Sequence, residues 1–125
     1  MTSIDPSALA RRERSLLMNG LVGPRPVAWV STVSPEGERN LAPFSFFNLF
    51  SYTPAVVAIG PGRRSGVEKD SLRNLTESGE FVVNMVDEAL AVLANASSAE
   101  FEPVVDEWAV LGLEGRPATT SHPTA

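Results

Sequence analysis

The residue types that most often carry catalysis are scarce in this sequence. It contains one histidine, His122, and no cysteine, which excludes a cysteine nucleophile, a disulfide and a thiolate metal site. It also lacks a P-loop and the glycine fingerprint of a dinucleotide-binding fold. His122 lies in a stretch rich in Pro, Thr, Ser and Ala, where a solvated side chain is expected rather than a ligand or general base. If the protein is an enzyme, a bound cofactor is expected to supply the chemistry.

Three segments have residues suited to holding a phosphorylated aromatic cofactor. In the first, residues 23–32, two prolines fix the approach to a strand, and Arg25 can meet a phosphate or a carboxylate. An ordinary strand start with a surface arginine would look the same. The candidate side chains on the strand itself are Trp29, Ser31 and Thr32.

The second segment, residues 40–47, combines small residues with aromatic ones. Small residues let backbone N–H groups approach a flat ring, aromatic residues can cover that ring, and Ser45 offers a hydroxyl. The alternative is a core segment whose phenylalanines simply pack together. The candidate residues are Asn40, Ala42, Pro43, Ser45 and Phe46.

The third segment places basic residues before a predicted helix. Basic side chains and a hydroxyl beside the exposed N–H groups of a helix start form an anion site. A charged, solvated loop with an ordinary helix cap is the alternative. The candidate residues are Arg63, Lys69, Ser71 and Asn74.

The elements expected to position these segments are mainly strands. β-Branched and aromatic residues predict a strand over residues 27–33, followed by a turn at 35–38. A second strand should return through residues 40–42, and its pairing should break at Pro43, which cannot donate a ladder hydrogen bond. The continuous apolar run 55–59 is typical of a central strand buried on both faces.

Helices and one further strand complete the expected order. Helices are predicted over residues 5–18, 70–77 and 88–96, with Asp5, Asp70 and Asp87 as their caps. The first should end at Asn19-Gly20 and the second at Ser78-Gly79, with Leu72 and Leu75 forming the buried stripe of the second. A strand is expected over residues 80–86.

Length and composition indicate one domain. The 125 residues are 43% hydrophobic, with 10 basic and 15 acidic residues, so nucleic acid and anionic lipid are not expected as partners. The N-terminal stretch has no apolar core of signal-peptide length, and no run approaches the roughly 20 apolar residues of a membrane span. A cytoplasmic protein is therefore expected, with a domain over residues 1–113 and a disordered tail over residues 114–125.

Four segments in collinear order resemble the flavin reductase-like family of FMN-binding split β-barrels. They are residues 23–33, residues 40–48, Lys69-Asp70-Ser71 with Asn74, and residues 79–84. The resemblance runs from Leu21 to Leu113 and includes Val105-Asp106-Glu107-Trp108. It implies a mainly β fold with short helices, of the split-barrel type. Family members continue with strands that close the barrel, so the fold is expected to be incomplete at the C-terminus.

The resemblance also implies a function. FMN would bind without covalent attachment at a homodimer interface, with residues 29–32 and 40–47 around the ring and the ribityl chain. Arg63, Lys69 and Ser71 would contact the phosphate. The expected activity is hydride transfer from NADH or NADPH to FMN, in some members to supply a partner monooxygenase. A truncated non-catalytic flavin-binding module and a purely structural or interaction domain remain as alternatives.

Overall fold

The fold is known from a computed structural model that describes residues 3–60, 63–64, 67–99, 101 and 105–118. The N-terminal part contains a short 3-10 helix at Pro6–Ala8, α1 (Arg11–Leu21), β1 (Ala28–Val33), β2 (Arg39–Phe44), β3 (Phe47–Tyr52) and β4 (Ala55–Ile59). There follow β5 (Arg63–Arg64), β6 (Val67–Glu68), α2 (Asp70–Ser78), β7 (Val82–Met85), α3 (Ala91–Ala96) and α4 (Glu107–Val110). The expected order, mainly strands with helical connections, is confirmed.

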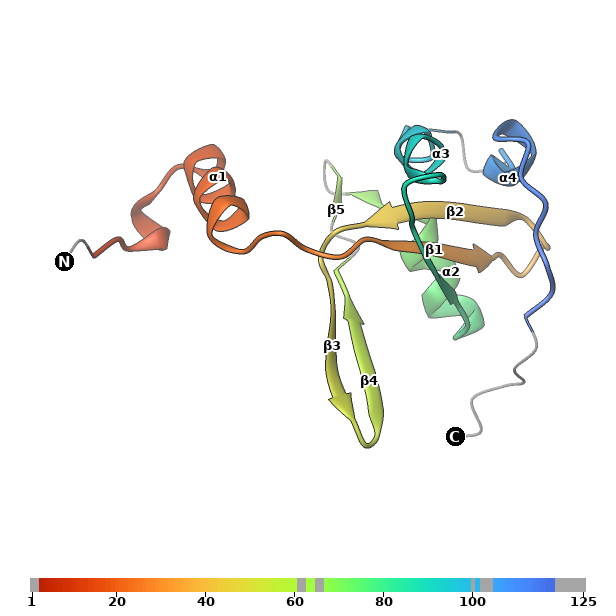
Figure 1. Ribbon diagram of the computed structural model, residues 1–125, viewed down its shortest axis with the longest axis horizontal. Coiled ribbons are helices and arrows are strands. Elements are labelled where there is room, and N and C mark those ends of the chain that lie inside the picture. Colours follow the sequence, from red (N-terminus) through yellow and green to blue (C-terminus); the bar gives the residue numbers. More distant parts are fainter. Residues whose placement is uncertain (1–2, 61–62, 65–66, 100, 102–104, 119–125) are drawn as a thin grey trace.

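A three-stranded antiparallel sheet in the order β2-β1-β7 forms the centre of the molecule (Figure 1). β2 continues past Pro43, which lies opposite Trp29 in the register, so the predicted break at this proline is wrong. The reason is that β2 is an edge strand. The backbone N–H of Leu41 points away from β1 to the Glu107 side chain, and the nitrogen of Pro43, two residues along, faces the same open edge, where no ladder hydrogen bond is lost.

Each face of this sheet carries its own apolar cluster. On one face Ala28, Val30 and Phe44 are buried, with partly buried side chains of β3, β4 and β7 against them. On the other face Trp29, Leu41 and Ala94 are buried, and side chains from the α3 and α4 region close over them. The sheet is therefore covered on one side by residues of β3 and β4, which precede β7 in the chain, and on the other by the α3 and α4 region, which follows it.

The β3–β4 hairpin extends away from this sheet (Figure 1). β4 pairs with β3, and its residues 55–58 are exposed, so the predicted central position of this strand, buried on both faces, is wrong. Apolar composition indicates that a strand suits burial, but it does not identify the surface that buries it. In the described part of the chain the hairpin leaves large apolar side chains exposed, among them Leu49, Phe50, Tyr52, Val56 and Val57.

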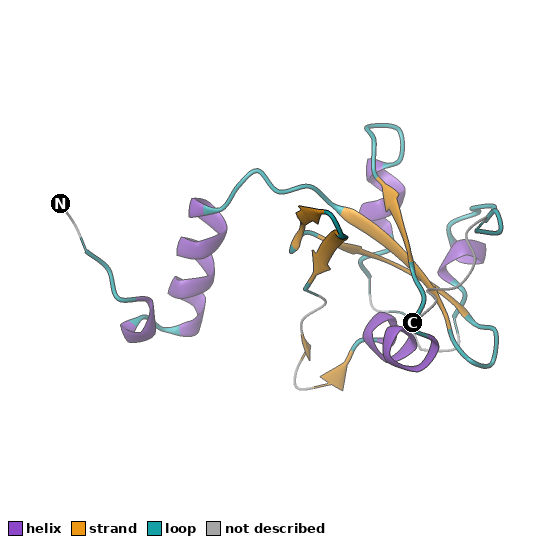
Figure 2. Cartoon of the chain, turned by 90° about the horizontal axis from the view of Figure 1, so that it is seen from below, coloured by secondary structure: helices purple, strands orange, loops and turns teal. Residues whose placement is uncertain are grey.

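The N-terminal helix differs from its prediction at both ends. Asp5 caps the 3-10 turn by accepting from the Ser7 N–H at 2.8 Å, and α1 begins only after Ala10, whose N–H donates to the Glu13 carboxylate at 3.1 Å. Gly20 does not end the helix, which runs to Leu21. α1 lies apart from the rest of the molecule, joined to β1 by an extended segment (Figure 2).

The helix α2 matches its predicted range but presents a different face to the sheet. Lys69 rather than Asp70 is the N-cap residue, and Gly79 ends the helix with φ at +70°, a left-handed conformation that favours glycine. The buried positions are Ser71 and Asn74, whereas Leu72 is only half-buried. The predicted leucine stripe is therefore wrong, because polar groups of β1 and β2 receive the polar side of the helix.

The remaining elements are shorter than expected. β7 covers four residues of the predicted 80–86 strand, and α3 forms only the last six residues of the predicted 88–96 helix. Asp87 acts before α3, where its Oδ1 accepts from the Leu90 N–H at 3.0 Å. Sequence reasoning did not predict α4, which Asp106 caps. His122 lies outside the described residues, as does most of the predicted disordered tail.

Candidate functional site

Four of the predicted site residues form one polar cluster between the sheet and α2. The Ser71 hydroxyl donates to Asn40 Oδ1 at 2.6 Å, and Asn74 Nδ2 donates to Thr32 Oγ1 at 3.1 Å. Thr32 and Asn40 are themselves opposite each other in the β1–β2 register. Thr32, Ser71 and Asn74 are each no more than 3% exposed. The cluster thus joins parts of all three segments that the sequence marked as cofactor-binding.

Glu107 extends this cluster and was not among the predicted site residues. Its Oε1 accepts from Asn40 Nδ2 at 2.8 Å, and its Oε2 accepts from the Leu41 N–H at 3.2 Å. The side chain therefore occupies part of the free edge of β2, where a neighbouring strand would otherwise pair. The one sequence signal for it was the acidic pair before Trp108, which entered only as part of the family resemblance. Its burial next to Asn40 depends on tertiary structure.

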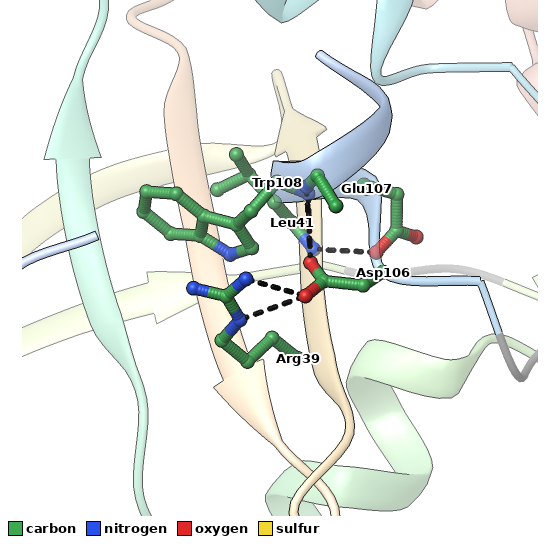
Figure 3. Close-up of polar contacts among 6 residues, drawn as sticks. Arg39, Leu41, Asp106, Glu107 and Trp108 are labelled. Carbon is green, nitrogen blue, oxygen red and sulfur yellow. Dashed lines mark hydrogen bonds and ion pairs between the residues drawn. The ribbon is translucent and has the colours of Figure 1, made fainter. Parts of the chain in front are cut away.

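The neighbouring acids Asp106 and Glu107, at the start of α4, contact different partners (Figure 3) and have pKa shifts of opposite direction. Burial raises the pKa of the Glu107 carboxyl, and the charge of Asp70 adds to the rise, although hydrogen bonds from Leu41 and Asn40 oppose it. Burial also acts to raise the pKa of Asp106, but hydrogen bonds and attraction from Arg39, with backbone N–H groups of α4, hold it below its ordinary value. Arg39 Nε donates to Asp106 Oδ2 at 2.9 Å.

These directions predict how stability depends on pH. The folded protein keeps a proton on Glu107 at pH values where the unfolded chain, with a pKa near 4.5, has lost it. The free energy of unfolding should therefore fall as pH rises from 4.5 through the raised folded pKa. Glu107→Gln should remove this slope in urea unfolding measured from pH 4 to 8. An equal slope in the variant would contradict the prediction. The lowered pKa of Asp106 affects a different pH range. Its contribution to stability should be lost as pH falls below 3.8, the value for the unfolded chain.

A second group of predicted residues lies where the N-terminal segment meets the start of the hairpin. Arg25 Nε donates to the Ser45 carbonyl at 3.0 Å, and the guanidinium carbon lies 5.3 Å from the centre of the Phe46 ring. Ser45 is exposed, and the Phe46 side chain is 60% exposed. These residues present an accessible aromatic face with a cation beside it.

The other predicted residues are divided between the core and the edge of the polar cluster. Trp29 is 4% exposed, and its indole N–H donates to Ser97 Oγ at 2.8 Å, so it belongs to the core. Asn84 Nδ2 donates to the Trp29 carbonyl at 2.9 Å and lies 3.4 Å from Ser31 Oγ.

Lys69 Nζ lies 5.1 Å from the centre of the Phe44 ring. Ala42 and Pro43 are half-buried on β2, and Arg63 lies on β5.

The donor and acceptor pattern of these residues fits a ligand that carries hydroxyl groups and an anionic end. Asn74 Oδ1 is buried and has no donor among the residues that the structure describes, and such an acceptor suits a ligand O–H or N–H group. The start of α2 favours an anion through its helix dipole, with the Lys69 cation beside it. The residues present therefore fit a flavin mononucleotide, which combines a phosphate, a ribityl chain and a flat ring.

Other kinds of site find no support in the described residues. No group of three or more His, Asp or Glu side chains there could hold a metal ion. No helix in the same part of the chain is long and apolar enough to cross a membrane. A shallow hollow of about 420 Å³ is lined by residues 49–53 at the hairpin, and none of the predicted site residues contributes to it.

The solved structures that are similar to this chain include the following three. Nitrilotriacetate monooxygenase component B from Bacillus cereus has a TM-score of 0.83 at 36% identity, over 90% of this chain and 55% of that one. The 2-nitrobenzoate 2-nitroreductase NbaA from Pseudomonas fluorescens has a TM-score of 0.81 at 37% identity, over 95% and 56%. A Shewanella frigidimarina protein with a split barrel domain has a TM-score of 0.74 at 22% identity, over 91% and 56%, which shows the shared fold.

The extent of these matches defines what is known of the chain. It spans about half the length of the curated relatives it matches, two of which are 41% identical to it and come from Deinococcus radiodurans and Halalkalibacterium halodurans. The predicted split-barrel fold, present in part, is confirmed. Residues 21–125 match the flavin reductase like domain. The chain therefore belongs to the flavin reductase like family of flavin-related oxidoreductases.

Proposed function

We propose that this chain binds FMN and belongs to an oxidoreductase that transfers a hydride from NADH or NADPH to the flavin. The family match over residues 21–125 supports flavin chemistry. The main support for the proposal is that side-chain hydrogen bonds connect β1 and β2 to α2. These are the hydrogen bonds Ser71–Asn40 and Asn74–Thr32. These hydrogen bonds gather the three sequence segments expected to surround the cofactor.

Each part of the site has a proposed role in holding FMN. Lys69 and the start of α2, with Arg63, would bind the phosphate, Ser71 would lie beside it, and Asn74 Oδ1 would accept from a ribityl hydroxyl. Arg25, Ser45 and Phe46 would lie against the ring. Bound flavin supplies the hydride acceptor, so the protein residues need only bind and orient it and limit access of water.

The complete protein is proposed to act as a homodimer in the cytoplasm. The exposed apolar residues of the β3–β4 hairpin provide surface that a second subunit could cover. Since one similar structure is a monooxygenase component, a monooxygenase is the proposed acceptor of the electrons. A non-catalytic flavin-binding module is the second candidate, because the chain spans about half the length of its relatives.

A visible absorption spectrum after gel filtration with excess FMN tests this proposal. Retained flavin absorbance would support binding, and oxidation of NADH or NADPH would then separate the enzyme from the non-catalytic module. Lys69→Gln should weaken FMN binding about tenfold with little effect on riboflavin, which lacks the phosphate. Arg11→Gln removes the same charge on α1, apart from the site (Figure 2), and should change neither. Colourless protein would contradict the proposal.

A further inference from the structure

The hydrogen bonds from Glu107 through Asn40 to Ser71 run in one direction. An ionised carboxylate can only accept, so Asn40 must turn its NH₂ group toward Glu107 Oε1, at 2.8 Å. Its carbonyl oxygen then faces Ser71, which donates its hydroxyl proton at 2.6 Å. The charge state of Glu107 thereby determines which acceptor receives the hydrogen bond from the Ser71 hydroxyl. We call this chain of three side chains the relay.

This direction conflicts with a phosphate contact from Ser71. A hydroxyl carries one proton, and a phosphate presents acceptor oxygens, so Ser71 cannot donate to Asn40 and to a phosphate through the same proton. Resting on the proposed function, we propose that Glu107 is a positioning residue that keeps the Ser71 hydroxyl turned away from the phosphate of FMN. Glu107 would thus limit how tightly the start of α2 holds the cofactor.

Substituting glutamine at position 107 should reverse the relay. The Leu41 N–H that contacts Glu107 Oε2 at 3.2 Å belongs to the backbone and cannot turn, so a glutamine must offer its carbonyl oxygen there. Its NH₂ group then faces Asn40, whose amide flips to accept from it. The flipped amide donates to Ser71 Oγ, which leaves the hydroxyl proton free for an anion.

The test compares dissociation constants for FMN and riboflavin by flavin fluorescence in four proteins: the unsubstituted chain, Glu107→Gln, Ser71→Ala and the double variant. Glu107→Gln should bind FMN about tenfold more tightly, the gain expected from one added hydrogen bond to a charged group. Riboflavin affinity should stay unchanged. In the Ser71→Ala background the gain should disappear. Loss of a merely structural contact would instead weaken both flavins.

Removing the negative charge of Glu107 could itself favour an anion, and a control variant separates this effect. Asp70→Asn removes a charge at the start of α2, where the Asp70 carboxylate pairs with Arg73 at 3.1 Å rather than hydrogen-bonding to a relay side chain. Its effect on FMN should decline with added salt and persist in the Ser71→Ala background. The increase in FMN affinity from Glu107→Gln should instead be insensitive to added salt and absent in the Ser71→Ala background.

Acidification provides a second measurement on the unsubstituted chain. A proton on Glu107 allows the same amide flip, so the ratio of FMN to riboflavin affinity should rise as pH falls, relative to Ser71→Ala. The charge of Asp70 on α2 acts on Glu107, and the ion pair of Arg39 with the preceding residue, Asp106, adjoins it. Arg39, Asp70 and Asp106 are the same in the unsubstituted chain and in Ser71→Ala, so their titration affects both proteins equally. Protonation of the FMN phosphate also affects both equally.

The outcomes separate the two proposals. If FMN binds but Glu107→Gln leaves its affinity unchanged, or the gain survives in Ser71→Ala, the relay is overturned and the flavin site stands. If Glu107→Gln does not fold, the pH measurement decides. The relay is overturned if the ratio of FMN to riboflavin affinity depends on pH in the same way in the unsubstituted chain and in Ser71→Ala. If no variant retains FMN at any pH, both proposals fail.

Discussion

Trp29→Ala should lower the free energy of unfolding by about 3–5 kcal/mol, as expected for truncating a buried tryptophan. Its side chain is 4% exposed and packs in one cluster with Leu41 and Ala94. Urea unfolding followed by the fluorescence of Trp108, the tryptophan that remains, would measure the loss. We expect this to be the largest effect of a single substitution on stability.

A matched variant separates packing from the indole hydrogen bond. Trp29→Phe keeps most of the ring volume and loses the donor to Ser97 Oγ, so it should cost about 1–2 kcal/mol. Ser97 retains its own bond to the Ala94 carbonyl at 2.8 Å. If Trp29→Ala abolished flavin binding while the unfolding free energy stayed unchanged, Trp29 would be a ligand contact rather than a core residue.

Asn40→Asp should destabilise the protein by about 2–4 kcal/mol at neutral pH, because it removes a donor and places a second carboxylate against Glu107. Asn40 Nδ2 is the group that now donates to Glu107 Oε1 at 2.8 Å. With two carboxylates at hydrogen-bonding distance, one must take up a proton. The loss should therefore shrink on acidification, which urea unfolding at pH 5 and pH 8 would reveal.

A second substitution should rescue the first. In Asn40→Asp combined with Glu107→Gln, the glutamine NH₂ group donates to the new carboxylate and its oxygen still accepts from the Leu41 N–H. Ser71 can still donate to position 40, so every hydrogen bond of the relay is restored. The double variant should recover most of the lost stability in a double-mutant cycle. Additive losses from the two substitutions would contradict this account of the contact.

The sequence predicted the local elements well where hydrophobic period and turn residues agreed. β1 begins one residue after its predicted start, and α2 ends at Gly79 as expected. The errors at Pro43 and at the apolar run 55–59 share one cause. In both cases the outcome depended on whether a strand lies at the edge or the centre of a sheet, and a strand's own residues do not specify its neighbours.

The candidate site was predictable as a set of segments but not as a set of contacts. The segments that contain Thr32, Asn40 and Ser71 were marked by residue type and by their resemblance to the family, which the match over residues 21–125 confirms. Their assignment as flavin contacts remains a prediction. Glu107 escaped notice because an acidic residue after a weakly patterned stretch reads as a surface residue until its neighbours are known.

The sequence by itself therefore determined the family, the type of each main element and the polar side chains available for binding. Those properties depend on residue types and on short spacings along the chain, which determine local structure. Only the tertiary structure decided that α2 buries Ser71 and Asn74 rather than its leucines, and that Glu107 reaches the edge of β2. Burial of a polar group costs least where a hydrogen-bond partner is present, and the partners of Ser71 and Glu107 lie 31 and 67 residues away in the chain.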